Sequence, residues 1–323
     1  MNLPLSQSTH LRLNNWLKWA WRENRPMALL GLGSTLFFLL ALFGLIVDPR
    51  TVLNEPTWIK PIKFGMSSIV YAYTLLWMLT YVEGRQRMIS LVSWVTSIGL
   101  TIELVLIGFQ AARGVRSHFN FTTAFDGAIF STMGVTILLV WIASLIAAFV
   151  LMRQSFTSRP FGLALKIGIV IGVIGAGLGN TMTTPTSAQM AQMQELGGPS
   201  PNIGAHSVGV EDGGEGLPIV GWSTEGGDKR VGHFIGLHGL QVLPLAGWFI
   251  MREKYRLRES QQMRLIWIAG AAYGGVMAIT VWQAVRGQPL ITPDALTLSV
   301  LFSLIAVLGV ATAMTLRGNQ HVH

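Results

Sequence analysis

Long apolar runs separated by short polar segments dominate the chain. Eight runs are close to the ~20 residues that a helix needs to cross the ~30 Å hydrocarbon core of a bilayer. They cover residues 27–47, 64–82, 90–112, 126–152, 162–182, 231–251, 264–285 and 293–316. We therefore predict an all-α, polytopic membrane bundle of about eight transmembrane helices, with five in residues 27–182 and three in residues 231–316.

Composition supports this class and excludes others. Charged residues make up 12% of the chain, about half the ~25% of globular proteins. The formal net charge of +8 does not indicate nucleic-acid binding, because cytoplasmic loops of membrane proteins collect Lys and Arg. The chain has no cysteine, which excludes disulfides, thiolate ligands and a cysteine nucleophile.

The segment before the first run, residues 1–26, has an amphipathic pattern. In "LRLNNWLKWAWRENRP" (11–26), apolar residues recur at helical spacing on one face, and basic residues supply the charge. Such a pattern is typical of a helix lying in the membrane interface. The alternative is a plain basic flank to the first span, and no cleavable signal peptide is expected ahead of it.

Basic residues are distributed unevenly between the two sides of the predicted bundle. With both termini in the cytoplasm, the inner segments hold fifteen Lys and Arg and the outer segments hold eight. This asymmetry favours an N-in, C-in orientation. We expect a multi-pass protein of a bacterial-type cytoplasmic membrane, with residues 317–323 as a cytoplasmic tail.

One connection, residues 183–230, is far longer than usual. It begins with a short helical pattern, "TTPTSAQMAQMQEL" (183–196), continues through a glycine-rich stretch and ends with apolar residues between Leu217 and Trp222. We predict an extracytoplasmic lid whose last third packs on the bundle and whose acidic residues are solvated. A disordered spacer is the alternative.

The sixth run opens with "RVGHFIGLHGLQVLP" (230–244), which is unusually polar for a span. Its three glycines, Gly232, Gly236 and Gly239, fall within ~40° of one another, which predicts close packing against a neighbouring helix. The glycines of the fifth run, between residues 168 and 179, predict the same. His233, His238 and Gln241 lie on the opposite arc, spread over ~140°.

The third run contains an acid, Glu103, with Gln110 on the same face. An acid inside a span is costly and by default marks function. We expect its partner to be His238 or Gln241 in the sixth run, and we predict Glu103 and His238 as the catalytic or proton-carrying pair. A neutral, hydrogen-bonded strut between helices is the alternative reading of Glu103.

Further polar residues gather at the outer ends of the spans. Lys60 and Lys63 come from the first outer loop. The predicted substrate-binding residues are Lys60, Lys63, Gln110, Arg113, Arg116, Asn120, Asp126, Asn180, Asp228, Arg230 and Gln241. The predicted metal ligands are His118, His233 and His238, since neutral imidazole is the common ligand of Zn, Cu and Fe. The alternatives are interfacial histidines, a helix cap at His118 and headgroup contacts for the two lysines.

Three functions stay open at this point. The first is a membrane-embedded enzyme with an outward-facing histidine site that holds a transition metal or haem b, if any cofactor binds. The second is a proton-coupled transporter of a small molecule or ion, in which the cationic residues attract an anionic substrate. The third is a membrane scaffold or signalling protein. Neither HExxH, GxSxG, CxxC nor a phosphate loop is present, and the partners expected are the bilayer and a small ligand, not nucleic acid.

Overall fold

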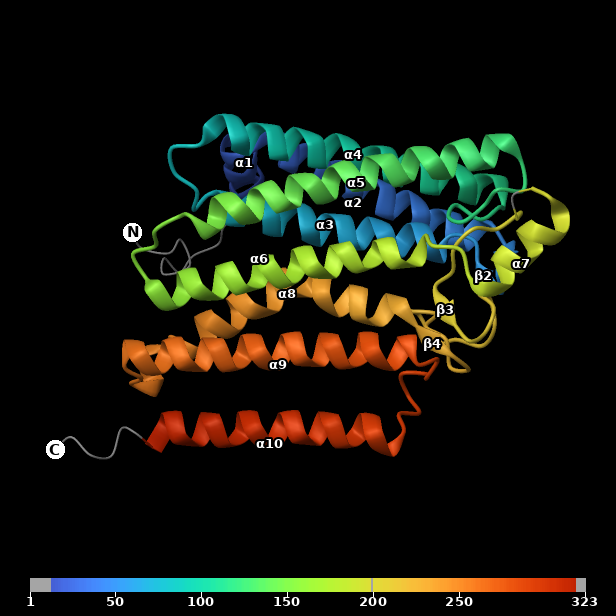
Figure 1. Cartoon of the computed structure of the whole chain (residues 1–323). Helices are drawn as coiled ribbons and strands as arrows, with labels where there is room; N and C mark the ends of the chain where they lie inside the picture. Colours follow the sequence, from blue (N-terminus) through green and yellow to red (C-terminus); the bar gives the residue numbers. More distant parts are fainter. Residues whose placement is uncertain (1–12, 199, 318–323) are drawn as a thin grey trace.

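The computed structural model describes residues 13–198 and 200–317, which are mostly helical (Figure 1). A short helix, α1 (Leu13–Glu23), precedes the long ones. Eight helices are long and apolar enough to cross a membrane, which confirms the predicted fold class of a multi-helix membrane bundle. They are α2 (Arg25–Val47), α3 (Ile59–Leu79), α4 (Gln86–Arg113), α5 (Ala124–Met152), α6 (Arg159–Leu178), α8 (Lys229–Ile250), α9 (Glu259–Val285) and α10 (Ala295–Arg317). The outer parts of the two predicted terminal segments, residues 1–12 and 318–323, lie outside the described residues.

Local sequence signals define where several helices begin and end. Asn24 caps α2 by accepting a hydrogen bond from the Met27 amide at 3.2 Å, and Ser158 and Thr123 cap α6 and α5 in the same way. These side chains satisfy amides that have no partner inside the helix. Gly114 ends α4 in the left-handed conformation, at φ 72°, which glycine adopts without steric cost.

The helices form two packed groups that are joined where α5 packs on α6. On one side α2 packs on α3 and α4, and α4 packs on α5; on the other, α8 packs on α6 and α9. Figure 1 shows the long helices running side by side, with α10 at the edge against α9. Of the described residues of α10, only Thr297 and Thr315 are buried, as expected for a helix whose apolar surface faces lipid.

The tightest helix pair is α6 and α8, and glycine makes it possible. A Cβ atom placed on Gly175 would collide with the backbone of Gly236, and one on Gly168 would lie 2.9 Å from the Gly239 carbonyl oxygen. The predicted close packing through the glycines of both runs is therefore confirmed. Because the two backbones meet, side chains on their flanks can reach carbonyl groups across the interface.

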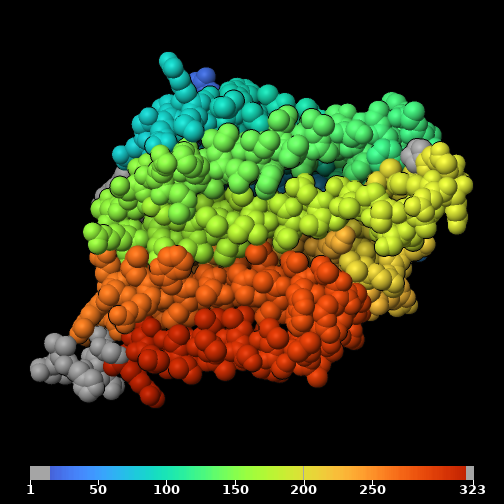
Figure 2. All heavy atoms as spheres, viewed as in Figure 1, coloured from blue at the N-terminus to red at the C-terminus, as the bar shows by residue number. Residues whose placement is uncertain are grey.

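The segment between residues 183 and 230, called the lid segment here, folds over one end of the bundle (Figures 1 and 2). It follows a 3-10 turn, η1 (Gly179–Met182), and contains the predicted short helix, α7 (Ser187–Leu196), which a Thr186–Gln189 capping box starts. Strand β3 (Ser207–Val208) pairs antiparallel with β4 (Gly227–Asp228).

A second hairpin, β1 (Thr51–Val52) with β2 (Glu55–Pro56), lies between α2 and α3, and η2 (Glu253–Tyr255) follows α8.

One placement from the sequence is wrong. Lys60 and Lys63 belong to the first two turns of α3, not to a loop, because the helix begins at Ile59 directly after the β1–β2 hairpin. The apolar run starts only at residue 64, since charged side chains at the end of a span lower the local hydropathy while their heads reach toward the interface. The two ammonium groups are therefore held on a regular helix.

Candidate functional site

Glu103 and His118 meet under the lid segment. Glu103 projects from the middle of α4 and is only 1% exposed, while His118 lies in the connection between α4 and α5. The distance from His118 Nε2 to Glu103 Oε1 is 3.3 Å. The second carboxyl oxygen, Oε2, is buried without a hydrogen-bond partner among the described residues. A buried polar atom of this kind is rare in folded proteins and calls for an explanation, such as a bound proton, water or ion.

His118 has a second polar contact and an aromatic surround. Ser117 Oγ lies 3.0 Å from His118 Nδ1, so both ring nitrogens are engaged. The ring also packs against Phe64, Phe119 and Phe130, with centroid distances between 5.7 and 6.1 Å. Burial first, and then the Lys60 ammonium, lower the pKa of His118, while the Glu103 carboxylate opposes this. His118 is therefore a neutral imidazole at neutral pH, able to accept a proton.

Lys60 interacts electrostatically with both members of this pair, Glu103 and His118. It stands in the first turn of α3, with its ammonium 5.7 Å from the centroid of the Phe64 ring. It interacts electrostatically with Glu103 and with the cations Arg116, Arg230 and Lys63. Within residues 13–198 and 200–317, no carboxylate lies within ion-pair distance of Lys60. An ammonium group among other cations, without a direct counter-ion, is suited to contact an anion.

The lid segment is tied to the site by a second His–Asp pair. Arg116 donates to Asn202 at 2.9 Å and lies 3.7 Å from Asp212. Asp212 in turn lies 3.0 Å from His206 Nδ1 and accepts from the backbone amides of residues 206 and 207. Burial lowers the pKa of His206 to about 4, and the hydrogen bonds that Asp212 accepts keep its own pKa below the usual range. The expectation that the acids of this segment are solvated is wrong for Asp212, which contacts Arg116 of the α4–α5 connection, and for Asp228, which is buried.

Phe119 separates the two histidines. Its ring lies 6.1 Å from the His118 ring and 4.9 Å from the His206 ring, and it is 2% exposed. Its backbone is left-handed, at φ 62°, and its carbonyl accepts from the Ile203 amide at 3.1 Å. Phe119 therefore links the lid segment to the α4–α5 connection.

Three predicted binding residues satisfy one another instead of facing an open site. Asp126, at the start of α5, accepts from Gln110 at 3.0 Å, from Arg113 at 2.5 Å and from Thr123 at 2.6 Å. Asp126 is 3% exposed. This cluster joins the ends of α4 and α5 and sets the geometry of the connection that carries His118. Asn120, also predicted, is buried and donates to the Arg116 carbonyl.

The remaining predicted cations of this end are paired with acids. Arg230 forms an ion pair with Asp228, which caps α8, and also donates to the Gly221 carbonyl of the lid segment. Lys63 lies 3.2 Å from both Glu55 and the Val220 carbonyl. Asn180 is exposed in the first half of η1. The apolar tail of the lid packs in part, since Trp222 stacks on Phe234 whereas Ile219 is 83% exposed.

The polar residues of α8 have partners away from Glu103. His233 Nδ1 lies 2.7 Å from the Gly175 carbonyl oxygen of α6. His238 Nδ1 lies 3.2 Å from Gln241 Oε1, and Gln241 donates to Thr74 of α3 at 3.1 Å. The expectation that Glu103 pairs with His238 or Gln241 is therefore wrong: its partner comes from the connection that follows its own helix.

The three histidines predicted as metal ligands each have a different partner, on different elements. In the described part of the chain, no group of three or more His, Asp or Glu side chains is arranged to hold a metal ion. A transition-metal or haem b site stays a prediction, and the proposal below uses neither.

The sequence pattern places Ser117 beside His118 at the same end of the bundle, but it does not single out two further residues of this site, His206 and Asp212. The available signal was that His206 is the only histidine of the lid segment, with Asp212 six residues later in a turn-rich stretch. Turns bring residues at this spacing together, so the pair could have been found.

Comparison with known proteins adds no assignment. No family model, no curated protein and no solved structure matches this chain.

Proposed function

We propose that this protein is a proton-coupled carrier of small anions, with Glu103 and His118 as the proton site and Lys60 as the anion contact. The observation that carries the proposal is the buried Glu103 carboxyl, one oxygen of which faces His118 while the other has no partner. Ionisable groups at membrane depth are costly to bury, and in transporters they serve as proton relays. This reading moves ahead of the metal enzyme because the three histidines have separate partners.

Electrostatic coupling supports a link between proton and anion. Protonation of Glu103 removes the negative charge nearest to Lys60, so the ammonium becomes free to hold an anion. Deprotonation of Glu103 restores an internal counter-ion and favours release of the anion. In a low-dielectric site the attraction between the Lys60 ammonium and its counter-ion is strong. Binding of the anion therefore depends on protonation of Glu103, as coupled transport requires.

The polar contacts between α3 and α8 support a path beyond the site. Thr74, Gln241 and His238 form a hydrogen-bonded chain between these helices. His238 and Gln241 lie ~14 and ~18 Å along α8 from Lys229 at the helical rise per residue. The side chains of Thr74, His238 and Gln241 could therefore form hydrogen bonds with an ion that moves from Lys60 toward the middle of the bundle.

Orientation belongs to the same proposal. Both termini lie in the cytoplasm, α1 lies in the inner interface, and the lid segment covers the outer mouth of the bundle in a bacterial-type cytoplasmic membrane. The excess of Lys and Arg in the segments at the opposite end from the lid supports this orientation. The site formed by Glu103, His118 and Lys60 would then face the outer side of the membrane, and the anion would bind beneath the lid segment.

The test is transport in proteoliposomes that contain a trapped pH-sensitive dye. Inorganic phosphate and a set of di- and tricarboxylates are added outside at pH 6, with pH 7 inside. We expect internal acidification with at least one anion, a loss of about 10–100-fold in Lys60→Met, and proton-uncoupled exchange in Glu103→Gln. Glu195→Gln, on the exposed face of α7, is the control. Equal proton flux with and without Glu103 would overturn the proposal.

A second candidate, an acyl hydrolase, rests on one contact. The Ser117 hydroxyl lies 3.0 Å from His118 Nδ1, and His118 Nε2 lies 3.3 Å from Glu103 Oε1. The residue types follow the order of nucleophile, base and acid in serine hydrolases, but the two ring nitrogens are exchanged relative to that triad. Labelling by a fluorophosphonate probe that is lost in Ser117→Ala but not in Ser207→Ala would favour this candidate over the carrier. Absence of labelling in the folded wild type would remove it.

A further inference from the structure

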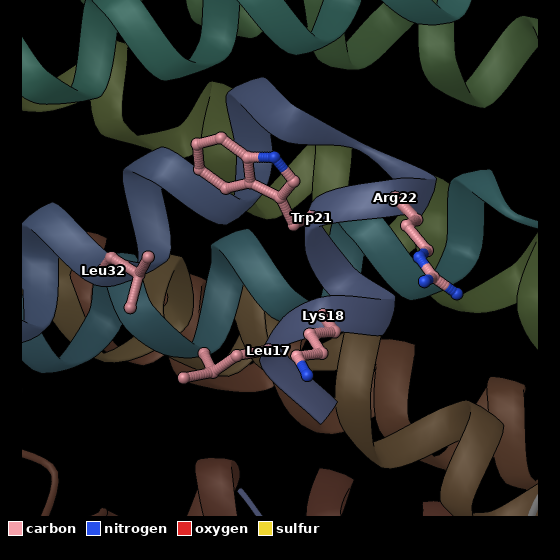
Figure 3. A pocket seen from close by; sticks show the side chains of 5 residues that line it. All are labelled: Leu17, Lys18, Trp21, Arg22 and Leu32. Atoms are coloured by element: carbon pink, nitrogen blue, oxygen red, sulfur yellow. The ribbon is translucent and has the colours of Figure 1, made fainter. Parts of the chain in front are cut away.

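A hollow lies between α1 and the start of α2, at the end of the bundle opposite the lid segment. Its volume is about 290 Å³, and Leu17, Lys18, Trp21, Arg22 and Leu32 line it. Figure 3 shows the apolar side chains Leu17, Trp21 and Leu32 on one side and the two cations on the other. The hollow is thus divided into an apolar and a cationic half.

Packing fixes the orientation of α1 relative to this hollow. Trp16 stacks on Tyr73 of α3 at a centroid distance of 4.4 Å, and Ala20 is fully buried. These contacts hold one face of α1 against the bundle and leave the face with Lys18 and Arg22 exposed. Since the two cations are four residues apart, they lie one turn from each other on the same side of the helix.

Neither cation is neutralised by the structure. Among the described residues, Lys18 and Arg22 take part in no ion pair. The apolar half continues along α2 as the exposed side chains Leu29, Leu32 and Leu36, which line the outside of the bundle. A ligand that fills both halves must therefore join an anionic group to a long apolar chain.

We propose that this hollow is a binding site for an anionic phospholipid, with the phosphate between Lys18 and Arg22 and an acyl chain along Leu17, Trp21 and Leu32. Tryptophan beside basic residues is typical of the headgroup level of a bilayer. Each Lys or Arg at a membrane surface attracts anionic lipid, and a fixed pair can bind one headgroup in place. The proposal does not depend on the transported ligand or on the site around Glu103.

The test uses the full-length protein, stripped of lipid in detergent. Phosphatidylglycerol, phosphatidylcholine and inorganic phosphate are added separately, and retained lipid is measured by native mass spectrometry together with the melting temperature. We expect phosphatidylglycerol to bind about 10-fold more tightly than phosphatidylcholine and to raise the melting temperature. Inorganic phosphate should do neither, because it has no acyl chain.

The double variant Lys18→Gln/Arg22→Gln should lose the preference for phosphatidylglycerol, and Leu32→Gln should weaken retention of both lipids. The matched control is Arg87→Gln/Arg264→Gln, which removes two exposed cations elsewhere and should keep the preference. Equal binding of phosphatidylglycerol and phosphatidylcholine, or full preference in the Lys18/Arg22 variant, would overturn the proposal. A response to inorganic phosphate equal to that of the lipid would show a plain anion site instead.

Discussion

At the scale of single residues, Asp126 is the clearest case of a buried charge with all its partners in place. It accepts from Gln110, Arg113 and Thr123 at the junction of α4 and α5. Asp126→Ala would leave buried donors unsatisfied, so we expect a loss of about 1–3 kcal/mol in the free energy of unfolding. Asp126→Asn keeps one acceptor and should cost less. Thermal unfolding in detergent measures both variants.

The exposed acid Glu195 on α7 supplies the comparison for this prediction. Glu195→Ala should leave the melting temperature close to that of the wild type, because a surface charge contributes little. A melting temperature of Asp126→Ala equal to that of Glu195→Ala would mean that the cluster does not stabilise the junction.

His206 predicts a pH dependence of stability. Its folded pKa is about 4, below the ~6.5 of an unfolded histidine. Above pH 6.5 the His206 imidazole is mostly neutral in both the folded and the unfolded chain. As the pH falls from 6.5 to 4, it binds a proton in the unfolded chain but stays neutral in the folded chain. Stability is therefore lost in this window, by about 3 kcal/mol at most, and no further loss from His206 occurs below pH 4.

The measurement compares the melting temperature of the wild type with that of His206→Gln between pH 7.5 and pH 4. The wild type should lose more stability over this range than the variant, which has no group that titrates at this position. Parallel pH profiles of the two proteins would contradict the prediction and place the acid sensitivity elsewhere.

Single residues also show why part of the site could not be read from the sequence. Glu103 stands out as an acid inside an apolar run, and its burial follows from that pattern. Its partner does not, because His118 reaches it only after the chain turns back at Gly114, which is in the left-handed conformation. Spacing along a helix predicts contacts on that helix, but not those made by a folded connection.

At the scale of elements, the α6–α8 contact predicts a strong effect of one added methyl group. Gly175→Ala would push its Cβ atom into the backbone of Gly236, which side-chain rotation cannot relieve. We expect a loss of about 1–3 kcal/mol, typical of overpacking, and a lower melting temperature.

Gly134→Ala in α5 is the matched substitution, since a Cβ atom there has no neighbour within 4 Å. Alanine has a higher helix propensity than glycine by ~1 kcal/mol, so this variant should be as stable as the wild type or slightly more so. If both variants unfold alike, the two backbones do not meet at Gly175.

Element types were more predictable than element ends. The glycine stripes of the fifth and sixth runs are regular, so the α6–α8 contact followed from their spacing. The starts of α3 and α9 came earlier than predicted, at Ile59 and Glu259, because hydropathy does not detect the charged first turns of a helix. No side chain caps the start of α3, whereas at the start of α9 the Gln261 side chain accepts from the Arg258 amide at 3.0 Å.

At the scale of the whole molecule, the orientation in the membrane can be measured directly. The chain has no cysteine, so a thiol reagent labels only the single cysteine that is introduced. We expect Glu211→Cys, exposed on the lid segment, to react with a membrane-impermeant maleimide in intact cells. Lys254→Cys, exposed at the opposite end, should react only after the membrane is broken. The reverse pattern would invert the proposed topology.

The number of spans could be predicted from the sequence because each span carries its own apolar signal. A lid is expected from the length of residues 183–230, but its individual contacts could not be predicted, because they join residues that are far apart in the chain, such as Lys63 with the Val220 carbonyl and Arg116 with Asn202. Such contacts form only after the helices have brought their ends together, and no local pattern encodes them.

The left-handed backbone of Phe119 bears on how readily the molecule opens. A non-glycine residue in this conformation costs about 1–2 kcal/mol, and here the Phe119 ring is held by Gly204 and His206 of the lid segment. When the lid lifts, these contacts are lost, but the backbone can relax to an ordinary conformation and recover that strain. The strain therefore offsets part of the stabilisation that these contacts give to the closed lid, and in the proposed carrier it would lower the free energy needed for opening when ligand or proton occupancy changes.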